Sequence, residues 1–336
     1  MGVVASLLAA SSSFAVAESR GGITDHQLAL TATPVIGGTA VPAGKWPDAV
    51  AVVGAQGSCT GTLVAPDIVI TAGHCADAGL TQVIANTTNY NNAGGVRSQI
   101  ASITAYPNWE TTYDIAVIKL ATPITTVTPR AVGAECTFQS FQNQMSVHLV
   151  GFGLTDTAGE GNNTSLREAT APVTDATCAN AAMGCQAGAA PAGEFIAGGG
   201  GTDSCFGDSG GPVYLDTPRG TMVIAAVSRG LDGSATPCGG GGIYVRTDKV
   251  LQWIEQTAGH PVTKDSCVTG GVTPPPEEDG GDDDDGGDPP GGGSGSGSGT
   301  TGSYGGEITG GCSTTGGSAG ALLGLGLLVG LRRRKR

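Results

Sequence analysis

The hexapeptide Gly207-Asp208-Ser209-Gly210-Gly211-Pro212 is the stretch from which the fold and the chemistry of this sequence can be inferred. Its serine has two possible partners upstream, His74 in Thr71-Ala72-Gly73-His74-Cys75 and Asp114 in Asp114-Ile115-Ala116-Val117. A serine hydroxyl is a weak nucleophile at neutral pH, so it needs an imidazole to accept its proton and an acid to orient that imidazole. Each residue alone would be interpreted as an ordinary turn residue, but together they predict a nucleophile, a base and an orienting carboxylate.

The serine motif also fits the Gly-x-Ser-x-Gly turn of α/β-hydrolases, which connects a strand to a helix. That fold requires the chain order serine, acid, histidine, whereas here the order is His74, Asp114, Ser209. The only histidine after Ser209 is His260, which follows the last helix-like segment. The glycine run 198–201 before the motif indicates a loop rather than a strand. The chain order therefore favours a different class of serine hydrolase.

In this order the three motifs resemble those of the trypsin-like members of the chymotrypsin family of serine endopeptidases, and the resemblance covers residues 35–267. It implies that Ser209 attacks the scissile carbonyl, that His74 accepts and then delivers the proton, and that Asp114 stabilises the imidazolium. It also implies an oxyanion hole formed by the backbone N–H groups of Gly207 and Ser209. Glycine suits position 207 because a side chain there would crowd the substrate.

The same resemblance implies a primary specificity pocket with Asp203 at its floor. A buried carboxylate there favours an Arg or Lys side chain, because an unpaired charge in a desolvated site is costly. Ser228, Gly230 and Gly242 correspond to the pocket walls, and the two glycines would leave room for a long side chain. The other interpretation is that Asp203 is only a loop acid. Arg229 stands where the family has a tryptophan, so a non-tryptic specificity also stays open.

Residues 35–270 are expected to form the protease domain, and its class is all-β. The apolar residues occur in short runs separated by Gly, Pro, Asn and Asp, a pattern typical of a sandwich or a barrel. The resemblance selects two antiparallel six-stranded β-barrels with the three catalytic candidates in the cleft between them. One C-terminal helix is expected from an N-cap at Asp248 to a stop near Gly259. The predicted strands are 49–53, 68–71, 115–120, 147–152, 222–228 and 243–247.

The sequence contains nine cysteines, and the absence of a zinc-type Cys-x-x-Cys pair favours disulfides over a metal site in an exported chain. We therefore expect no metal and no other cofactor. Sequence alone leaves the connectivity open. By resemblance to the family, eight cysteines pair and Cys312 is left over. The implied pairs are Cys59 with Cys75, Cys136 with Cys267, Cys178 with Cys185 and Cys205 with Cys238.

The N-terminal segment predicts export followed by proteolytic activation. Residues 1–17 are apolar and end in Ala-Val-Ala, a small-x-small cleavage pattern typical of a signal peptide; the alternative is a short buried helix. Residues 18–34 would then be a propeptide, because Val35 begins a Val-Ile-Gly-Gly motif that resembles the mature start of the family. By that resemblance, the freed amino group of Val35 pairs with Asp208. Pro34 precedes the cut, so we expect a separate activating protease.

The composition changes after the last predicted disulfide. Residues 271–311 consist mainly of Gly, Pro, Ser and Asp, and such a segment cannot bury enough apolar area to offset its ordering entropy, so we expect a disordered acidic linker. Calcium binding is the weaker alternative, because the acids lack the spacing of a calcium loop. Residues 312–336 begin with Cys312, contain the apolar run 319–331 and end in the basic run 332–336.

This tail resembles the C-terminal sorting signals of Gram-negative bacteria, of the MYXO-CTERM and GlyGly-CTERM types. The resemblance implies transit through the inner membrane, removal of the tail by a sorting protease, and display at the outer-membrane surface, with Cys312 as a lipidation candidate. A permanent weak membrane anchor is the alternative, since the apolar run is shorter than the roughly 20 residues of a full span.

The net charge of −13 gives no support to nucleic-acid binding. The interpretation that combines these observations is a secreted serine endopeptidase that cleaves protein or peptide substrates after Arg or Lys. Its alternatives are the same protease with another specificity, a catalytically silent surface-binding member of the family, and a lipase or esterase that uses the same three residues.

Overall fold

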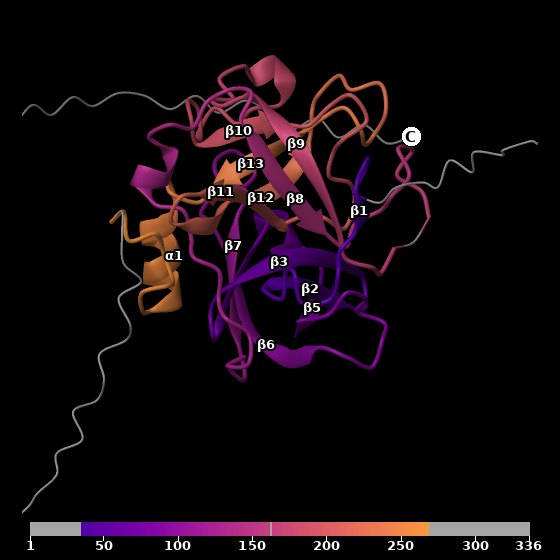
Figure 1. The fold of residues 1–336 in the computed structure, drawn as a ribbon, viewed down its shortest axis with the longest axis vertical. Coiled ribbons are helices and arrows are strands. Elements are labelled where there is room, and N and C mark those ends of the chain that lie inside the picture. Colours follow the sequence, from indigo (N-terminus) through magenta and orange to yellow (C-terminus); the bar gives the residue numbers. More distant parts are fainter. Residues whose placement is uncertain (1–34, 162, 269–336) are drawn as a thin grey trace, which may run out of the picture. The chain divides into compact units, whose positions relative to one another are not determined.

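The computed structural model describes residues 35–161 and 163–268, which form two antiparallel β-barrels and a C-terminal α-helix (Figure 1). The predicted fold class is confirmed. The segments interpreted as signal peptide, propeptide, linker and sorting tail, including Cys312, lie outside the described residues. Within the described residues no helix is long and apolar enough to cross a membrane.

The N-terminal barrel closes in the strand order β2-β3-β4-β7-β6-β5. Its strands carry an inner face of β-branched residues, and in β4 all four residues, Ile-Val-Ile-Thr, are buried. β-Branched side chains favour strands because they pack well on a pleated surface. The strands are β2 (Ala49–Gly54), β3 (Gly57–Ala65), β4 (Ile68–Thr71), β5 (Leu80–Ala85), β6 (Val96–Ala105) and β7 (Ala116–Leu120).

The C-terminal barrel has the order β9-β10-β13-β12-β11-β8, and pairing between β8 and β9 closes it. The short strand β1 (Thr39–Ala40) adds to β9 from outside the ring. Alternation is clear in β9, where Ala169, Ala171 and Val173 are buried and the residues between them face outward. The strands are β8 (Ser146–Gly151), β9 (Arg167–Asp175), β10 (Glu194–Ala197), β11 (Pro212–Thr217), β12 (Gly220–Gly230) and β13 (Gly242–Arg246).

The helix α1 (Leu251–Ala258) begins later than predicted. Asp248 does not cap it: the N-cap position is Val250, without a side-chain cap, and the Asp248 carboxylate instead accepts hydrogen bonds from Arg246. The predicted stop is correct, because Gly259 adopts the left-handed conformation that ends a helix. Three short 3₁₀ helices complete the structure: η1 (Gly73–Asp77), η2 (Glu135–Phe138) and η3 (Ala181–Met183).

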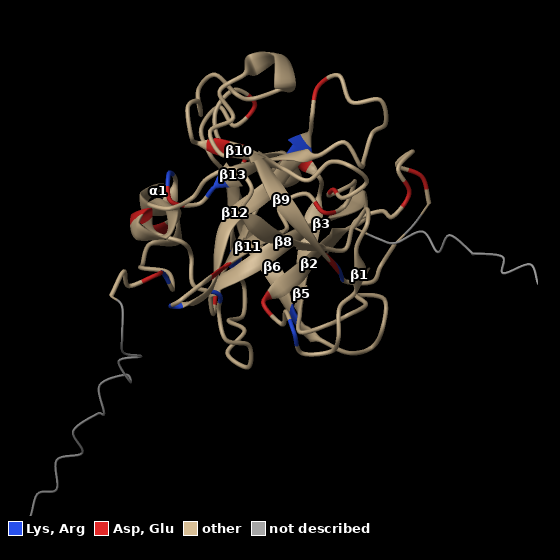
Figure 2. Ribbon diagram, turned by 45° about the horizontal axis from the view of Figure 1, so that its top comes forward, with Lys and Arg blue, Asp and Glu red and all other residues tan. Residues whose placement is uncertain are grey.

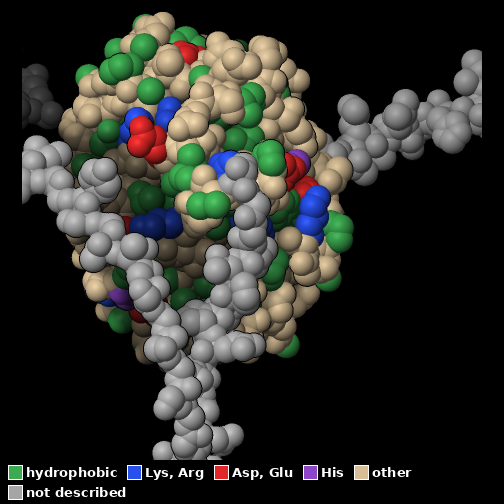
Figure 3. All heavy atoms as spheres, turned by 60° about the vertical axis from the view of Figure 1, so that its left-hand side comes forward, with side chains coloured by type: hydrophobic (Ala, Val, Ile, Leu, Met, Phe, Trp, Pro, Cys, Tyr) green, Lys and Arg blue, Asp and Glu red, His purple; other side chains and the backbone are tan. Residues whose placement is uncertain are grey.

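Charged side chains are sparse on the described fold. Figure 2 shows acidic and basic residues dispersed over the loops and strand ends. On the face in Figure 3, Lys, Arg, Asp and Glu side chains are interspersed among hydrophobic and uncharged groups.

Candidate active site

His74 and Asp114 are in contact at the edge of the N-terminal barrel. His74 lies in η1, directly after β4, and Asp114 lies two residues before β7. The two oxygens of Asp114 accept hydrogen bonds from the backbone N–H of His74 (2.8 Å) and from its ring Nδ1 (2.9 Å). Gly73 permits this approach, because a Cβ there would lie 3.0 Å from Asp114 Oδ1. The backbone and the ring of His74 are thus both held by one carboxylate.

The charge on Asp114 determines which ring nitrogen of His74 carries the proton. Burial raises the pKa of Asp114. The hydrogen bonds that it accepts from His74 and Ser228, and its electrostatic interaction with the His74 ring, outweigh that effect, so the pKa lies below its ordinary value. An ionised carboxylate can only accept hydrogen bonds, so Nδ1 must be the donor. In the neutral ring, Nε2 is then the acceptor.

Ser228 supplies the third hydrogen bond to Asp114. Its hydroxyl donates to Asp114 Oδ2 at 2.7 Å. The pairing of β12 with β13 shifts register between Val227 and Arg229, so Ser228 is the extra residue at this irregularity. The family resemblance placed Ser228 in the wall of the specificity pocket. It does line the central pocket, but its hydroxyl is directed at the acid.

Ser209 lies in the turn before β11, and its backbone is tied to both barrels. The carbonyl of Ser209 accepts a hydrogen bond from the N–H of Thr60 in β3 (2.9 Å), and the N–H of Gly210 donates to the carbonyl of Val227 in β12 (2.7 Å). Gly210 has a φ of 77°, and a Cβ there would collide with the N-terminal barrel. The turn therefore requires glycine after the serine.

One pocket of about 450 Å³ is lined by all three catalytic candidates, His74, Asp114 and Ser209. The three motifs therefore come together at this pocket, although 135 positions of the chain separate His74 from Ser209. The other lining residues are Trp109, Ser204, Cys205, Phe206, Val227, Ser228, Arg229, Gly230, Pro237 and Cys238.

Asp203 is buried next to this pocket, with an exposed fraction of only 1%. Its Oδ2 accepts hydrogen bonds from the N–H groups of Gly239 (2.9 Å) and Gly241 (3.1 Å), whereas Oδ1 has no hydrogen-bond partner among the described residues. Burial raises its pKa to about 6. Asp203 and Gly242 do not themselves line the 450 Å³ pocket; Ser204 does. A Cβ on Gly242 would lie 3.1 Å from Asp203 Oδ1, so only glycine leaves that oxygen uncovered.

Asp208, the residue before the nucleophile candidate, is also a buried acid. Its carboxylate accepts hydrogen bonds from the N–H groups of Gly153 (2.7 Å) and Cys205 (2.9 Å). Burial, together with the nearby charge of Asp203, raises its pKa to about 7. Among the described residues no Lys, Arg or His pairs with it. The part of the chain that the structure describes thus supplies no counter-charge to Asp208.

The predicted mature start lies against the specificity loop. Val35 is 1% exposed and packs in the core of the C-terminal barrel. The next residue, Ile36, forms an antiparallel bridge with Asp203, whose N–H donates to the carbonyl of Ile36 at 3.0 Å. The segment that follows the expected cleavage point is therefore anchored beside the two acids.

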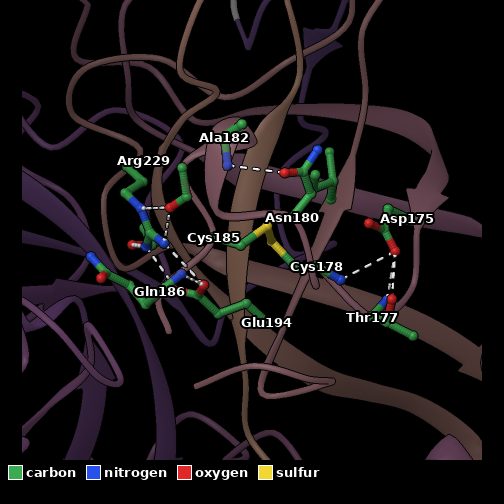
Figure 4. The surroundings of a disulfide bond; sticks show 12 residues. Asp175, Thr177, Cys178, Asn180, Ala182, Cys185, Gln186, Glu194 and Arg229 are labelled. Atoms are coloured by element: carbon green, nitrogen blue, oxygen red, sulfur yellow. Dashed lines mark hydrogen bonds and ion pairs between the residues drawn. A yellow bond between two sulfur atoms is a disulfide. The ribbon is translucent and has the colours of Figure 1, made fainter. Parts of the chain in front are cut away.

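Arg229 does not extend a free positive charge into the pocket. Its guanidinium forms an ion pair with Glu194 through two hydrogen bonds, Nη1 to Oε1 (2.8 Å) and Nη2 to Oε2 (2.9 Å). It also donates to the carbonyl of Gly184 and to the hydroxyl of Ser228 (Figure 4). Glu194 is 1% exposed at the start of β10. The positive charge that the sequence placed in this subsite is therefore balanced inside the protein.

Eight of the nine cysteines form four disulfides, with the connectivity that resemblance implied. These bonds also involve both groups of described side chains that are close enough together to hold a metal ion. Among the described residues, the groups that could hold a metal each contain a bonded cysteine pair, Cys59 and Cys75 with His74, or Cys136 and Cys267 with Asp265. A cysteine binds a metal ion as its thiolate, so a cysteine in a disulfide cannot serve as a ligand.

Sequence reasoning missed three residues that shape the site. Glu194 neutralises Arg229, and Thr60 donates its hydroxyl to the carbonyl of Gly207 at 2.8 Å. Gly153 leaves space for the Asp208 carboxylate, which a Cβ at that position would overlap. The only signal for Gly153 was its place in the pattern Gly-x-Gly after β8. Thr60 and Glu194 are unremarkable in the sequence.

Comparison with known proteins agrees with this geometry. The family model described as "Trypsin" matches residues 35–254. Chymotrypsin-like elastase family member 1 of Bos taurus is 30% identical over 241 residues, which cover 66% of this chain and 88% of the relative. Serine protease 56 of Homo sapiens is 30% identical over 246 residues (69% of this chain, 40% of the relative), and Trypsin Blo t 3 of Blomia tropicalis is 28% identical over 207 residues (59% and 76%). With two six-stranded barrels and a match over most of its length, this chain belongs to the trypsin family of serine endopeptidases.

Proposed function

We propose that this enzyme is an exported endopeptidase that cleaves after Arg or Lys with His74, Asp114 and Ser209 as its catalytic residues. The observation that supports this most strongly is the His74–Asp114 pair, which lines the same pocket as Ser209 and leaves Nε2 of the imidazole as an acceptor. The simplest test is labelling by a reactive phosphonate. One phosphonyl group should attach to Ser209, and Ser209→Ala should remove it.

The chemistry follows from these positions. Ser209 Oγ attacks the peptide carbonyl while its proton moves to His74 Nε2, and Asp114 stabilises the imidazolium that forms. The imidazolium then gives that proton to the leaving amine as the C–N bond breaks, which leaves an acyl group on Ser209. A water molecule, deprotonated by the same imidazole, attacks the ester, and the acid product leaves as Ser209 regains its proton.

The tetrahedral oxyanion would bind to the N–H groups of Gly207 and Ser209. Neither N–H donates a hydrogen bond to another described residue, so both are available. The φ of 96° at Gly207 is in the left-handed region, which glycine adopts without strain. Each well-placed donor of this kind lowers the barrier by about 3 to 4 kcal/mol.

The preference for Arg and Lys rests on Asp203. A buried carboxylate oxygen without a hydrogen-bond partner is rare in folded proteins, and it marks a position where a donor from outside is expected. Arg229 does not oppose a cationic substrate, since Glu194 balances its charge. Gly230 lines the pocket, and a Cβ there would contact only the carbonyl of Pro237 at 3.4 Å, so the entrance is open.

The same protease with another specificity is the second candidate, because one of the matched relatives is named an elastase. Peptides that differ only in the residue before the cut separate the two. Hydrolysis after Arg or Lys should be fastest, and Asp203→Ser should reverse the order. Faster hydrolysis after Ala or Val in the unaltered enzyme would favour the elastase-like alternative.

A silent binding protein and an esterase are weaker alternatives on the same framework. A silent member would show no phosphonate label on Ser209 although the protein is folded. An esterase would be labelled but would cleave esters and leave matched peptide amides intact. The proposed function requires both labelling and peptide cleavage.

Activation is proposed to follow cleavage after Pro34. The freed amino group of Val35 would supply the positive charge that Asp208 lacks among the described residues, and the residue after it, Ile36, is already fixed beside Asp203. Since trypsin-like enzymes cut after Arg or Lys, a separate protease would make this cut. N-terminal sequencing checks this: a mature start at Val35 in the unaltered protein but not in Ser209→Ala would show self-activation and contradict the proposal.

Export and surface display are proposed from the sequence of residues 1–17 and 312–336. Fractionation of cells that make the full chain should place the protease at the outer surface. Cys312→Ser should release it if that cysteine carries the lipid. Retention in the inner membrane would favour the permanent anchor instead.

A further inference from the structure

We infer that Arg229 and Glu194 form a positioning unit for the catalytic acid, acting on Asp114 through the hydroxyl of Ser228. This inference rests on the proposed function, because it assigns a task at the same site. The contacts that support it run in one line from Glu194 to Arg229, then to Ser228 and Asp114.

The guanidinium of Arg229 has no donor left for a substrate. Arginine has five N–H groups and no acceptor. Nε and Nη2 each donate to the carbonyl of Gly184 (3.1 and 2.6 Å), Nη1 and Nη2 each donate to Glu194 (2.8 and 2.9 Å), and Nη1 donates to Ser228 Oγ (2.8 Å). All five N–H groups therefore have partners within the protein, so Arg229 lines the pocket without a free donor to bind a substrate.

The direction of these hydrogen bonds orients the Ser228 hydroxyl. A serine hydroxyl has one proton and can rotate to suit its partners. Because Arg229 can only donate, Ser228 Oγ must accept from it, and the hydroxyl proton is left for Asp114 Oδ2 at 2.7 Å. Polarisation of the hydroxyl by the guanidinium also strengthens this second bond. Asp114 in turn holds Nδ1 of His74, so the line ends at the catalytic base.

The partners of Arg229 are themselves fixed by the fold (Figure 4). Gly184 precedes Cys185, which is bonded to Cys178, so its carbonyl is held by a closed loop. Glu194 Oε2 also accepts a hydrogen bond from the N–H of Gln186 at 2.8 Å. A cation and an anion that neutralise each other can stay buried, whereas one left alone would be costly. The pair thus holds a donor next to Ser228 without adding net charge beside Asp114.

The test uses the full enzyme processed at Val35 and a small organophosphate such as diisopropyl fluorophosphate. This reagent reports the reactivity of Ser209 without filling the peptide subsites near Arg229. Arg229→Met should slow labelling of Ser209 and peptide hydrolysis by the same factor, about tenfold, since residues of one hydrogen-bond network are energetically coupled. A slower peptide hydrolysis with unchanged labelling would contradict the inference and indicate a substrate subsite.

A double-mutant cycle tests the route through Ser228. In a Ser228→Ala background, Arg229→Met should slow labelling by less than twofold further, because the hydroxyl through which it acts is gone. An equal loss in both backgrounds would overturn the inference. If Arg229→Met does not fold, the same comparison with Arg229→Lys applies: we expect a loss of about threefold when Ser228 is present and none in the Ser228→Ala background.

Arg219 provides the matched control. It forms a similar ion pair with Asp265, also with the acid 1% exposed, but it does not line the active-site pocket. Arg219→Met should lower the melting temperature and leave the labelling rate within twofold. An equal slowing in Arg219→Met would show that loss of any buried ion pair has this effect and would contradict a specific role for Arg229. Failure of the unaltered enzyme to label at all would instead overturn the proposed function.

Discussion

The pKa values of buried acids are shifted in opposite directions in two regions of the active site. On the side of the N-terminal barrel, Asp114 accepts hydrogen bonds from His74 and Ser228, and its pKa is lowered despite burial. On the side of the C-terminal barrel, burial raises the pKa of Asp203 to about 6 and that of Asp208 to about 7, because the hydrogen bonds that they accept, mainly from backbone N–H groups, do not offset their desolvation.

Only one of the three acids has a basic side chain as its partner among the described residues. The partner of Asp114 is the imidazole that it orients. The carboxylates of Asp203 and Asp208 pair with no cation among the described residues, and an ammonium or guanidinium group is the kind of donor that suits them. In the proposed function, the substrate side chain forms an ion pair with Asp203 and the new N-terminus forms an ion pair with Asp208. Four predictions test this contrast.

The largest effect is expected for substitution of Asp114. Asp114→Asn keeps the size of the side chain but removes the charge that makes Nδ1 the donor, so the ring can take the wrong tautomer. The value of kcat/KM should fall by about 10⁴-fold, the magnitude typical of this substitution in the family. Steady-state hydrolysis of an Arg peptide measures it; a loss below tenfold in a folded variant would show that Asp114 does not act as proposed.

Asp208 should make the unprocessed protein less stable as the pH rises. Its folded-state pKa of about 7 exceeds the ordinary 3.8, so its contribution to stability is fully present below pH 4 and is lost as the pH rises to 7. A shift of this size corresponds to a loss on the order of 4 kcal/mol. Urea unfolding of Ser209→Ala precursor between pH 4 and 7 measures it, with the chain processed at Val35 as the control.

In that processed chain the amino group of Val35 should keep Asp208 ionised, so the decline attributed to Asp208 should disappear. The smaller decline caused by Asp203 remains in both forms. Identical pH dependence in precursor and processed chain would contradict the assigned partner of Asp208.

Asp203→Ser should change specificity more than catalysis. Removing the carboxylate takes away the partner of a cationic side chain, so the ratio of kcat/KM for Arg over an uncharged residue should fall by about 100-fold. The phosphonate labelling rate with an uncharged reagent should stay within a few-fold. A variant that keeps its preference for Arg would show that Asp203 does not determine specificity.

The smallest predicted effect is a pH-dependent preference in the unaltered enzyme. Protonation of Asp203 below its pKa of about 6 removes the charge that binds Arg, so the preference for Arg over an uncharged residue should fall about tenfold from pH 7 to pH 5. Measuring both substrates at each pH cancels any pH effect on the catalytic step that both share. A constant ratio would mean that Asp203 stays ionised or is not used.

Much of the fold followed from the sequence because its signals are local. The six predicted strands all correspond to observed ones, with ends that differ by no more than two residues. Seven of the thirteen strands in the described part of the chain were not predicted. Strand β9 is one of them: its inward residues Ala169 and Ala171 are small and Pro172 interrupts the run, so its strand propensity is low although alternation is present. Asp248 looked like an N-cap, but Arg246 two residues earlier competes for its carboxylate.

The site was predictable where a motif carries the residue and unpredictable where the partner comes from elsewhere in the chain. His74, Asp114 and Ser209 each lie in a short motif, and the structure brings all three to one pocket. Arg229 stood out in the sequence, yet its meaning depended on Glu194, which lies 35 residues upstream and has no motif of its own. The hydrogen bond from Ser228 to Asp114 depends on a register irregularity in β12, which no local sequence pattern predicts.

The most direct test of the central claim is mass spectrometry of the enzyme processed at Val35 after reaction with an arginine-like phosphonate. We expect one adduct per chain, on Ser209, and its loss in both His74→Ala and Ser209→Ala. A folded, processed enzyme that forms no adduct on Ser209, or one that forms it equally well without His74, would contradict the claim that these residues act together.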